Sequence, residues 1–147
     1  MKKKNSDISF GVIGLGRFGS ALVKTLAEAG KEVIAIDKDE QRVKAVRKYT
    51  DFAFVVDNLN QETLEETGIQ NCDVAVVCIG EQIATSILTT LNLVSLGIPK
   101  VVSKANSAEH GEILAKLGAE VVYPERDMAI RLANRLETVR VLDFIQL

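Results

Sequence analysis

Three glycines spaced as GxGxxG, with an aspartate downstream, are the residues of this sequence whose types and positions could do chemistry. Gly14, Gly16 and Gly19 follow an apolar segment directly, and Asp37 ends the next one. Such glycines allow a tight turn, a close approach of backbone to phosphate oxygens, and close packing of a helix on a sheet. The first N–H groups of that helix and its dipole attract an anion. The pattern predicts a phosphate-binding turn.

The position of Asp37 adds a second indication of a nucleotide site. A dinucleotide fold places an acid at the end of its second strand, where the carboxylate accepts a hydrogen bond from a ribose hydroxyl. A carboxylate there repels a 2′-phosphate, which disfavours NADP. Asp37 alone also fits a turn carboxylate or a helix cap, because Asp39 and Glu40 follow closely. Strand, glycine turn, helix and acid together favour a nucleotide site.

Alternating strands and helices are needed to position these residues. Apolar runs predict strands over 8–13, 32–37, 52–56, 74–79, 100–103 and 120–123. Helical patterns lie at 17–29, 39–48, 61–66, 82–96 and 108–117, and a last helix begins at Pro124. This order predicts an α/β fold: a Rossmann-like, doubly wound, six-stranded parallel sheet with right-handed crossovers and a C-terminal crossover helix.

Two segments carry more apolar residues than a single sheet needs. Helix 82–96 is apolar around most of its circumference, so we expect one side on the sheet and the other in a subunit interface or under a neighbouring helix. The last helix has an apolar stripe at Met128, Leu132 and Leu136, and residues 139–147 continue as an apolar tail. We expect the tail to dock on another subunit, as part of a longer protein.

Composition limits the class of protein. The 147 residues carry a net charge of −2 with both signs mixed, which argues for one domain and against a nucleic-acid or membrane-surface binder. No apolar run has the length of a membrane span, and no signal peptide is recognisable, so we expect a cytoplasmic protein. Cys72 and Cys78 are expected to be reduced core thiols, and His110, the single histidine, to lie on a helix surface.

Recognisable reaction machinery is missing from the sequence. It contains no GxSxG elbow, HExxH motif, Walker lysine or paired catalytic carboxylates. We therefore expect a binding module and not an enzyme. The cofactor-binding domain of an NAD-dependent oxidoreductase remains an alternative, since the glycines and Asp37 fit it equally. A structural Rossmann domain with an empty site is a third reading.

Three segments in order, residues 12–19, 124–129 and 141–147, resemble the N-terminal lobe of an RCK (regulator of potassium conductance, or KTN) domain. The closest likeness is to the cytoplasmic regulatory subunits of Ktr-type potassium uptake systems, and it covers essentially the whole chain. The resemblance implies dimers assembling into an octameric ring on the inner face of a membrane potassium transporter. It implies ATP for the active ring and ADP for the inactive one, with NAD(H) as the alternative ligand used by related Trk regulators.

The same resemblance assigns domains. Residues 1–138 would be the nucleotide-binding lobe, and 139–147 the tail of the segment that crosses to a partner. Family members usually carry a C-terminal lobe after this helix, which this sequence does not contain. We therefore expect a truncated form or the first lobe of a longer protein.

The resemblance also assigns the site residues. Gly14, Gly16, Arg17 and Gly19 would hold phosphates, Asp37 the ribose, and Asp57 and Asn58 would lie near the adenine. Glu125 matches a position associated with a divalent cation between subunits, although a surface carboxylate at a helix N-terminus fits it equally. The full predicted nucleotide-binding set is Gly14, Leu15, Gly16, Arg17, Phe18, Gly19, Asp37, Lys38, Asp57, Asn58, Ile79, Gly80, Lys104 and Ala105.

Overall fold

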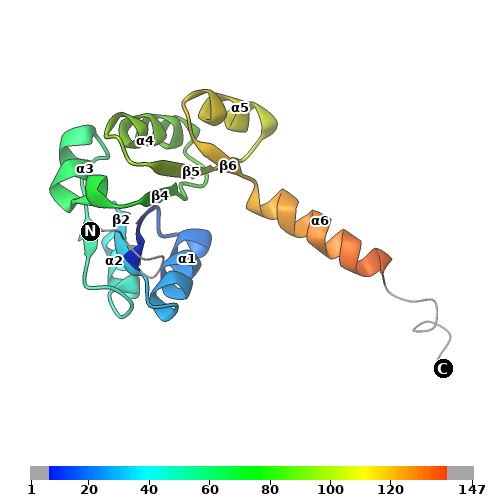
Figure 1. The fold of residues 1–147 in the computed structure, drawn as a ribbon, viewed down its shortest axis with the longest axis horizontal. Helices are drawn as coiled ribbons and strands as arrows, with labels where there is room; N and C mark the ends of the chain where they lie inside the picture. Colours follow the sequence, from blue (N-terminus) through cyan, green and yellow to red (C-terminus); the bar gives the residue numbers. More distant parts are fainter. Residues whose placement is uncertain (1–6, 139–147) are drawn as a thin grey trace.

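A six-stranded parallel sheet forms the centre of the molecule (Figure 1). The computed structural model describes residues 7–138, and the strand order is β3-β2-β1-β4-β5-β6. The strands are β1 (Ser9–Ile13), β2 (Glu32–Asp37), β3 (Ala53–Val55), β4 (Val74–Val77), β5 (Lys100–Lys104) and β6 (Glu120–Val122). All five strand pairs are parallel. The Rossmann-like sheet predicted from the sequence is confirmed.

Helices connect the strands at almost the predicted positions. They are α1 (Arg17–Glu28), α2 (Glu40–Val46), α3 (Gln61–Thr67), α4 (Ile83–Ser95), α5 (Ala108–Lys116) and α6 (Pro124–Glu137). A 3-10 turn, η2 (Ile69–Asn71), was not predicted. Side chains of Asp39, Asn60 and Ser107 accept hydrogen bonds from first-turn N–H groups of α2, α3 and α5. These caps explain where the three helices begin.

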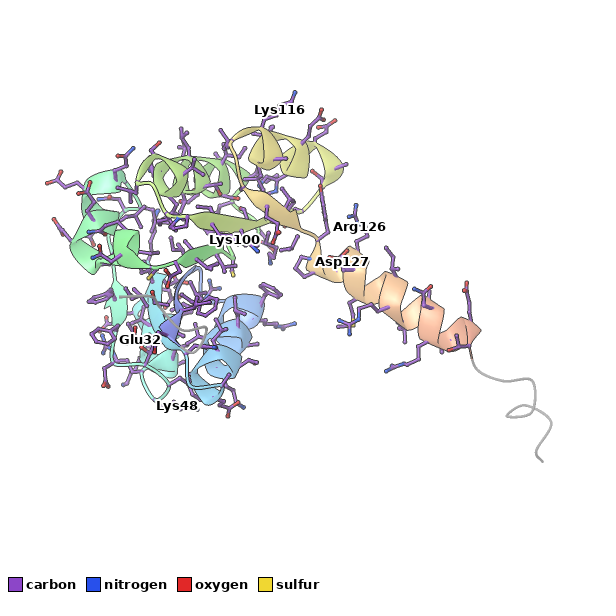
Figure 2. All side chains as sticks on the ribbon, viewed as in Figure 1. Glu32, Lys48, Lys100, Lys116, Arg126 and Asp127 are labelled. Atoms are coloured by element: carbon purple, nitrogen blue, oxygen red, sulfur yellow. The ribbon has the colours of Figure 1, made fainter. Side chains whose placement is uncertain are left out.

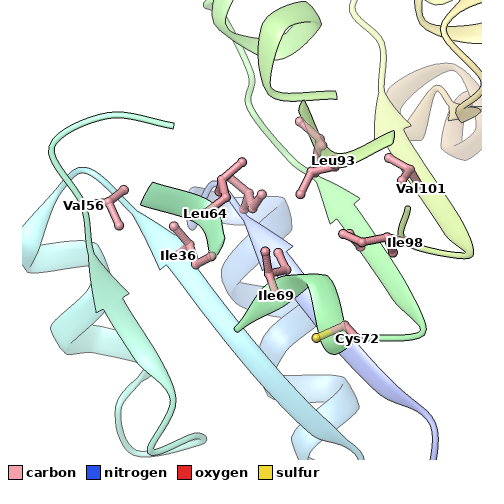
Figure 3. Packing of buried hydrophobic residues seen from close by; sticks show 11 residues of the cluster. Ile36, Val56, Leu64, Ile69, Cys72, Leu93, Ile98 and Val101 are labelled. Carbon is pink, nitrogen blue, oxygen red and sulfur yellow. The ribbon is translucent and has the colours of Figure 1, made fainter. Parts of the chain in front are cut away.

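The core consists of two layers, one on each face of the sheet. On one face, Val23 of α1 and Val43 and Val46 of α2 pack on Val12 and Ala35. On the other face, α3, η2 and α4 pack on β1, β2, β4 and β5 (Figure 3). Helices on both faces follow from right-handed crossovers that run in opposite directions from β1.

Helix α4 presents hydroxyl groups, not its most apolar side, to the interior. Ser86, Thr89 and Thr90 are buried with Leu93, whereas Leu88 is 58% exposed. The neighbouring helix α5 packs against α4 where His110 contacts Ser86, but this contact leaves Leu88 exposed. The alternative of a subunit interface remains a prediction.

Helix α6 projects from the body of the molecule and buries none of its residues (Figure 1). The predicted stripe of Met128, Leu132 and Leu136 is exposed along it. The predicted tail, 139–147, lies outside the described residues. From residue 7 to residue 138, no helix is both long enough and apolar enough to cross a membrane.

A leucine pair on α4 tests the observed orientation of this helix. Leu93→Ala removes a side chain with no exposed surface, so we expect the free energy of unfolding to fall by about 2–5 kcal/mol. Leu88→Ala, at an exposed position of the same helix, should change it by less than ~1 kcal/mol. Denaturant unfolding at low protein concentration measures both, and equal losses would contradict the orientation.

Candidate nucleotide-binding site

The sheet contains a point where its winding changes direction. β1 has β2 on one side and β4 on the other, so the connections leaving β1 and β3 run to opposite faces. Ligands of doubly wound sheets bind at this point, outside the carboxyl ends of the strands. A crevice of about 1390 Å³ lies there, lined by residues that follow β1, β2, β4 and β5.

The glycine turn contributes Gly14 and Gly16 to the lining of this crevice. Gly14 has a φ of +94°, which favours glycine, and its N–H donates to the carbonyl of Ile36 at 2.9 Å. A Cβ on Gly19 would lie 1.7 Å from the Gly14 carbonyl oxygen. Helix α1 can therefore start against the turn only because residue 19 has no side chain.

Asp37 holds this turn through its carboxylate and is 8% exposed. Its Oδ2 accepts from the Leu15 N–H at 2.7 Å, and its Oδ1 accepts from the Asp39 N–H at 2.8 Å. Arg42 lies 3.9 Å from Oδ2. Each carboxylate oxygen can accept a further hydrogen bond, so the arrangement leaves capacity for a ribose hydroxyl. Asp37 thus acts as a turn carboxylate, which is one of the roles that the sequence left open for it.

The N-terminus of α1 differs from those of the helices that have side-chain caps. Its N-cap is Gly16, which supplies no side-chain hydrogen bond, and its first turn has no acidic residue. By contrast α2, α3 and α5 each have a side-chain cap and an acid in the first turn. The uncapped N-terminus of this 12-residue helix leaves N–H donors and the positive end of the helix dipole available to an anion.

Basic side chains add positive charge to the same crevice. Arg17, Lys38 and Lys104 line it, and the Lys104 Nζ lies 5.8 Å from the centre of the Phe18 ring. Burial raises the pKa of the Cys78 thiol to about 12, although the charge of Lys104 acts in the lowering direction. The thiol is therefore protonated at neutral pH, which argues against a nucleophilic role.

Most of the predicted site residues come together in the crevice. Those that line it are Gly14, Gly16, Arg17, Phe18, Asp37, Lys38, Ile79, Gly80, Lys104, Ala105 and Glu125. Leu15 and Gly19 lie behind it and act on its shape through the contacts described above. Asp57 and Asn58 do not line it. Asn58 Oδ1 accepts from the Asn60 N–H and the Thr63 hydroxyl at the start of α3.

Sequence reasoning missed several lining residues. Arg42, Thr85, Asn106 and Tyr123 all line the crevice. Asn106 could have been predicted from the sequence, since it comes two residues after β5 and the carboxyl ends of parallel strands lie at one edge of the sheet. The others lie on or next to helices and had no motif to mark them.

Glu125 lies in the first turn of α6 and lines the crevice. The guanidinium of its neighbour Arg126 lies 3.9 Å from the centre of the Tyr123 ring. Its Nε is also 3.9 Å from Oδ1 of Asp127, the next residue of α6 (Figure 2 labels Arg126 and Asp127). Over the described part of the chain, no three His, Cys, Asp or Glu side chains gather where they could hold a metal ion. The cation assigned to Glu125 therefore remains a prediction.

His110 is not on a helix surface, and that expectation is wrong. The side chain is 2% exposed, and burial lowers its pKa below the ordinary value. It lies between α5 and α4, where its ring nitrogens have polar partners on both sides. The helical pattern could not reveal these partners, because one of them comes from a different helix.

The comparison with known families agrees with this architecture. A family model described as the TrkA-N domain matches residues 10–124. The chain belongs to this family. The resemblance to the RCK N-terminal lobe of Ktr systems is thereby confirmed, because the relatives of this TrkA-N chain include several Ktr proteins.

Two of these relatives and one channel of known structure illustrate what this TrkA-N chain is similar to. Ktr system potassium uptake protein C of Bacillus subtilis (strain 168) is 44% identical over 139 residues, 94% of this chain and 63% of that protein. Ktr system potassium uptake protein A of Vibrio alginolyticus is 39% identical over 142 residues, 96% of this chain and 64% of that protein. The chain thus spans less than two thirds of the length of these relatives.

The channel is GsuK, whose structures include nucleotide complexes. The NAD-bound channel has a TM-score of 0.75 at 28% identity, covering 92% of this chain and 24% of that one. The ADP-bound form has a TM-score of 0.73 at 28% identity, covering 92% and 35%.

The two glycines of the turn should respond differently to substitution. Gly19→Ala places a methyl group against the Gly14 carbonyl, so we expect the free energy of unfolding to fall by about 1–3 kcal/mol. A Cβ on Gly16 meets nothing within 4 Å, so Gly16→Ala should leave it within ~0.5 kcal/mol. Thermal and denaturant unfolding measure both. A stable Gly19→Ala variant would contradict the observed packing.

Proposed function

We propose that the crevice binds an adenine nucleotide and that the chain is the nucleotide-sensing lobe of a regulatory subunit of a membrane potassium transporter. In this proposal the protein is not an enzyme: ligand binding shifts a conformational equilibrium through its differential affinity for two states. Residues 1–138 form the nucleotide-binding unit and 139–147 belong to the crossover segment. The subunit works in the cytoplasm, at the inner face of the membrane.

The observation that carries the proposal is the uncapped N-terminus of α1 beside Asp37 and basic side chains. Arg17 and Lys104 supply charge for phosphates, and Asp37 keeps acceptor capacity for a ribose. The remaining predicted residues, including Asp57 and Asn58 near the adenine, belong to the proposal as well. The GsuK complexes support an adenine-containing ligand, since one holds ADP and another NAD.

Among adenine nucleotides we propose ATP and ADP, with NAD(H) as the alternative. Arg17 favours this choice because a guanidinium can pair with phosphate oxygens in a bidentate manner, so each added phosphate can gain a charge-assisted hydrogen bond. Glu125 would complete the site by holding a divalent cation together with a second subunit.

Assembly into an octameric ring of dimers needs two different contact surfaces, one within dimers and one between them. The chain exposes two apolar surfaces on separate elements. One is the stripe of Met128, Leu132 and Leu136 on α6, and the other includes Leu88 and Leu91 on α4. We propose that the α6 stripe pairs two subunits and that the α4 surface joins pairs into the ring.

Substitution of Arg17 tests the proposed ligand. Because Arg17→Ala removes a charge-assisted contact to phosphate, we expect ATP to bind about tenfold more weakly while adenosine affinity changes little. Isothermal titration calorimetry with ATP, ADP, NAD, NADH and adenosine gives these affinities.

Arg47→Ala, an exposed arginine at the end of α2, is the control and should bind like the wild type. Equal losses for ATP and adenosine would refute the role of Arg17. Tight binding of NAD or NADH alone would favour the oxidoreductase alternative, and no binding of any nucleotide would favour a structural domain.

The α6 stripe is tested through the oligomeric state. Leu136→Glu places a charge in the stripe, so we expect it to lower the apparent mass measured by light scattering after size exclusion. Asn134→Glu adds the same charge to the opposite side of α6 and should leave the mass unchanged. A monomeric wild type, or equal effects of the two substitutions, would contradict the pairing.

A further inference from the structure

A buried histidine connects two loops of the crevice, and the proposed function makes no use of it. His110 lies in the first turn of α5, and its Nδ1 accepts from the backbone N–H of Asn106 at 3.1 Å. Its Nε2 lies 3.0 Å from the hydroxyl of Ser86, a fully buried residue of α4. The ring is therefore fixed from both sides.

These contacts select one form of the imidazole. Because Nδ1 accepts a hydrogen bond from an N–H group, it carries no proton, and the proton of the neutral ring is on Nε2. Nε2–H then donates to the Ser86 hydroxyl. Burial keeps the ring neutral by lowering its pKa. The backbone of His110 is fixed as well, since its N–H donates to the Ser107 hydroxyl at 3.1 Å.

The contact with Asn106 continues into the crevice. The side-chain amide of Asn106 donates to the carbonyl of Gly80. Gly80 follows β4 and Asn106 follows β5, so this bond joins the loops at the carboxyl ends of two neighbouring strands. Both residues line the crevice.

We propose that His110 is a positioning residue for nucleotide binding: through Asn106 it holds residues 79–82 and 105–107 in the arrangement that receives the ligand. The inference rests on the proposed nucleotide site. Even a histidine that only filled the core would need a hydrogen-bond partner for each ring nitrogen. The identity of one partner is what points to positioning: it is the backbone of Asn106, a crevice residue whose side chain contacts the second loop.

Two substitutions separate the two contacts of the ring. In His110→Asn the side-chain oxygen can occupy the place of Nδ1 and accept from Asn106, but the side chain is too short for Ser86. In His110→Gln the side-chain amide can reach Ser86, and the Asn106 N–H loses its acceptor. We expect ADP to bind about tenfold more weakly to His110→Gln and within about twofold of wild type to His110→Asn.

Two further variants separate positioning from stability. Asn106→Ala removes an exposed side chain, so it should weaken ADP binding like His110→Gln while the melting temperature changes little. Thr90→Val is the control, because it breaks another buried hydroxyl pair of α4, with Ser103 at 3.0 Å, that reaches neither loop. It should lower the melting temperature and leave ADP affinity unchanged.

Calorimetry with ADP and NAD, together with amide hydrogen exchange of the full 147-residue chain without nucleotide, completes the test. Faster exchange of residues 79–82 and 105–107 in His110→Gln and Asn106→Ala than in His110→Asn supports positioning. Equal exchange in all variants, or losses of affinity that simply follow melting temperature, would overturn it. If the wild type binds neither nucleotide, the proposed function fails, and the exchange rates still decide whether His110 holds the loops.

Discussion

The contact between Gly19 and the carbonyl of Gly14 is the constraint on which the rest of the structure depends. With a Cβ only 1.7 Å from that oxygen, α1 could not begin where it does, and the turn after β1 would have to open. This turn also places the Leu15 N–H where it donates a hydrogen bond to the Asp37 carboxylate. One close backbone approach therefore fixes the end of β1, the start of α1 and the acid at the end of β2 relative to one another.

The parts of the site that the sequence predicted are those encoded by neighbours in the chain. Gly14, Gly16 and Gly19 act within one turn, and Asp37 follows a strand that must pair with β1, so spacing alone places them. Asn58 was placed near the adenine by the family resemblance, and that placement stays a prediction. In the structure its side chain accepts hydrogen bonds at the start of α3, and such local hydrogen bonding cannot be seen in the residue spacing.

For α4 the sequence left open what covers its second side, and the reason is different. Hydrophobicity identifies residues that avoid water but does not say whether the chain's own sheet or another molecule covers them. The buried side of α4 carries Ser86 and Thr90, whose hydroxyls have buried partners on α5 and β5, and Leu88 is left exposed. His110 was misplaced for the same reason, since a buried imidazole is stable only with partners from distant segments.

The crevice also brings the two ends of the domain into one site. Arg17 and Asp37 line it from the glycine turn, while Glu125, Met128 and Leu132 line it from α6. Met128 and Leu132 also belong to the exposed stripe on a helix without a buried residue. The same residues can thus contact both a ligand and a second subunit. A ligand that contacts α6 differently in two arrangements of that helix shifts the balance between them by its difference in affinity, which is the physical requirement for sensing.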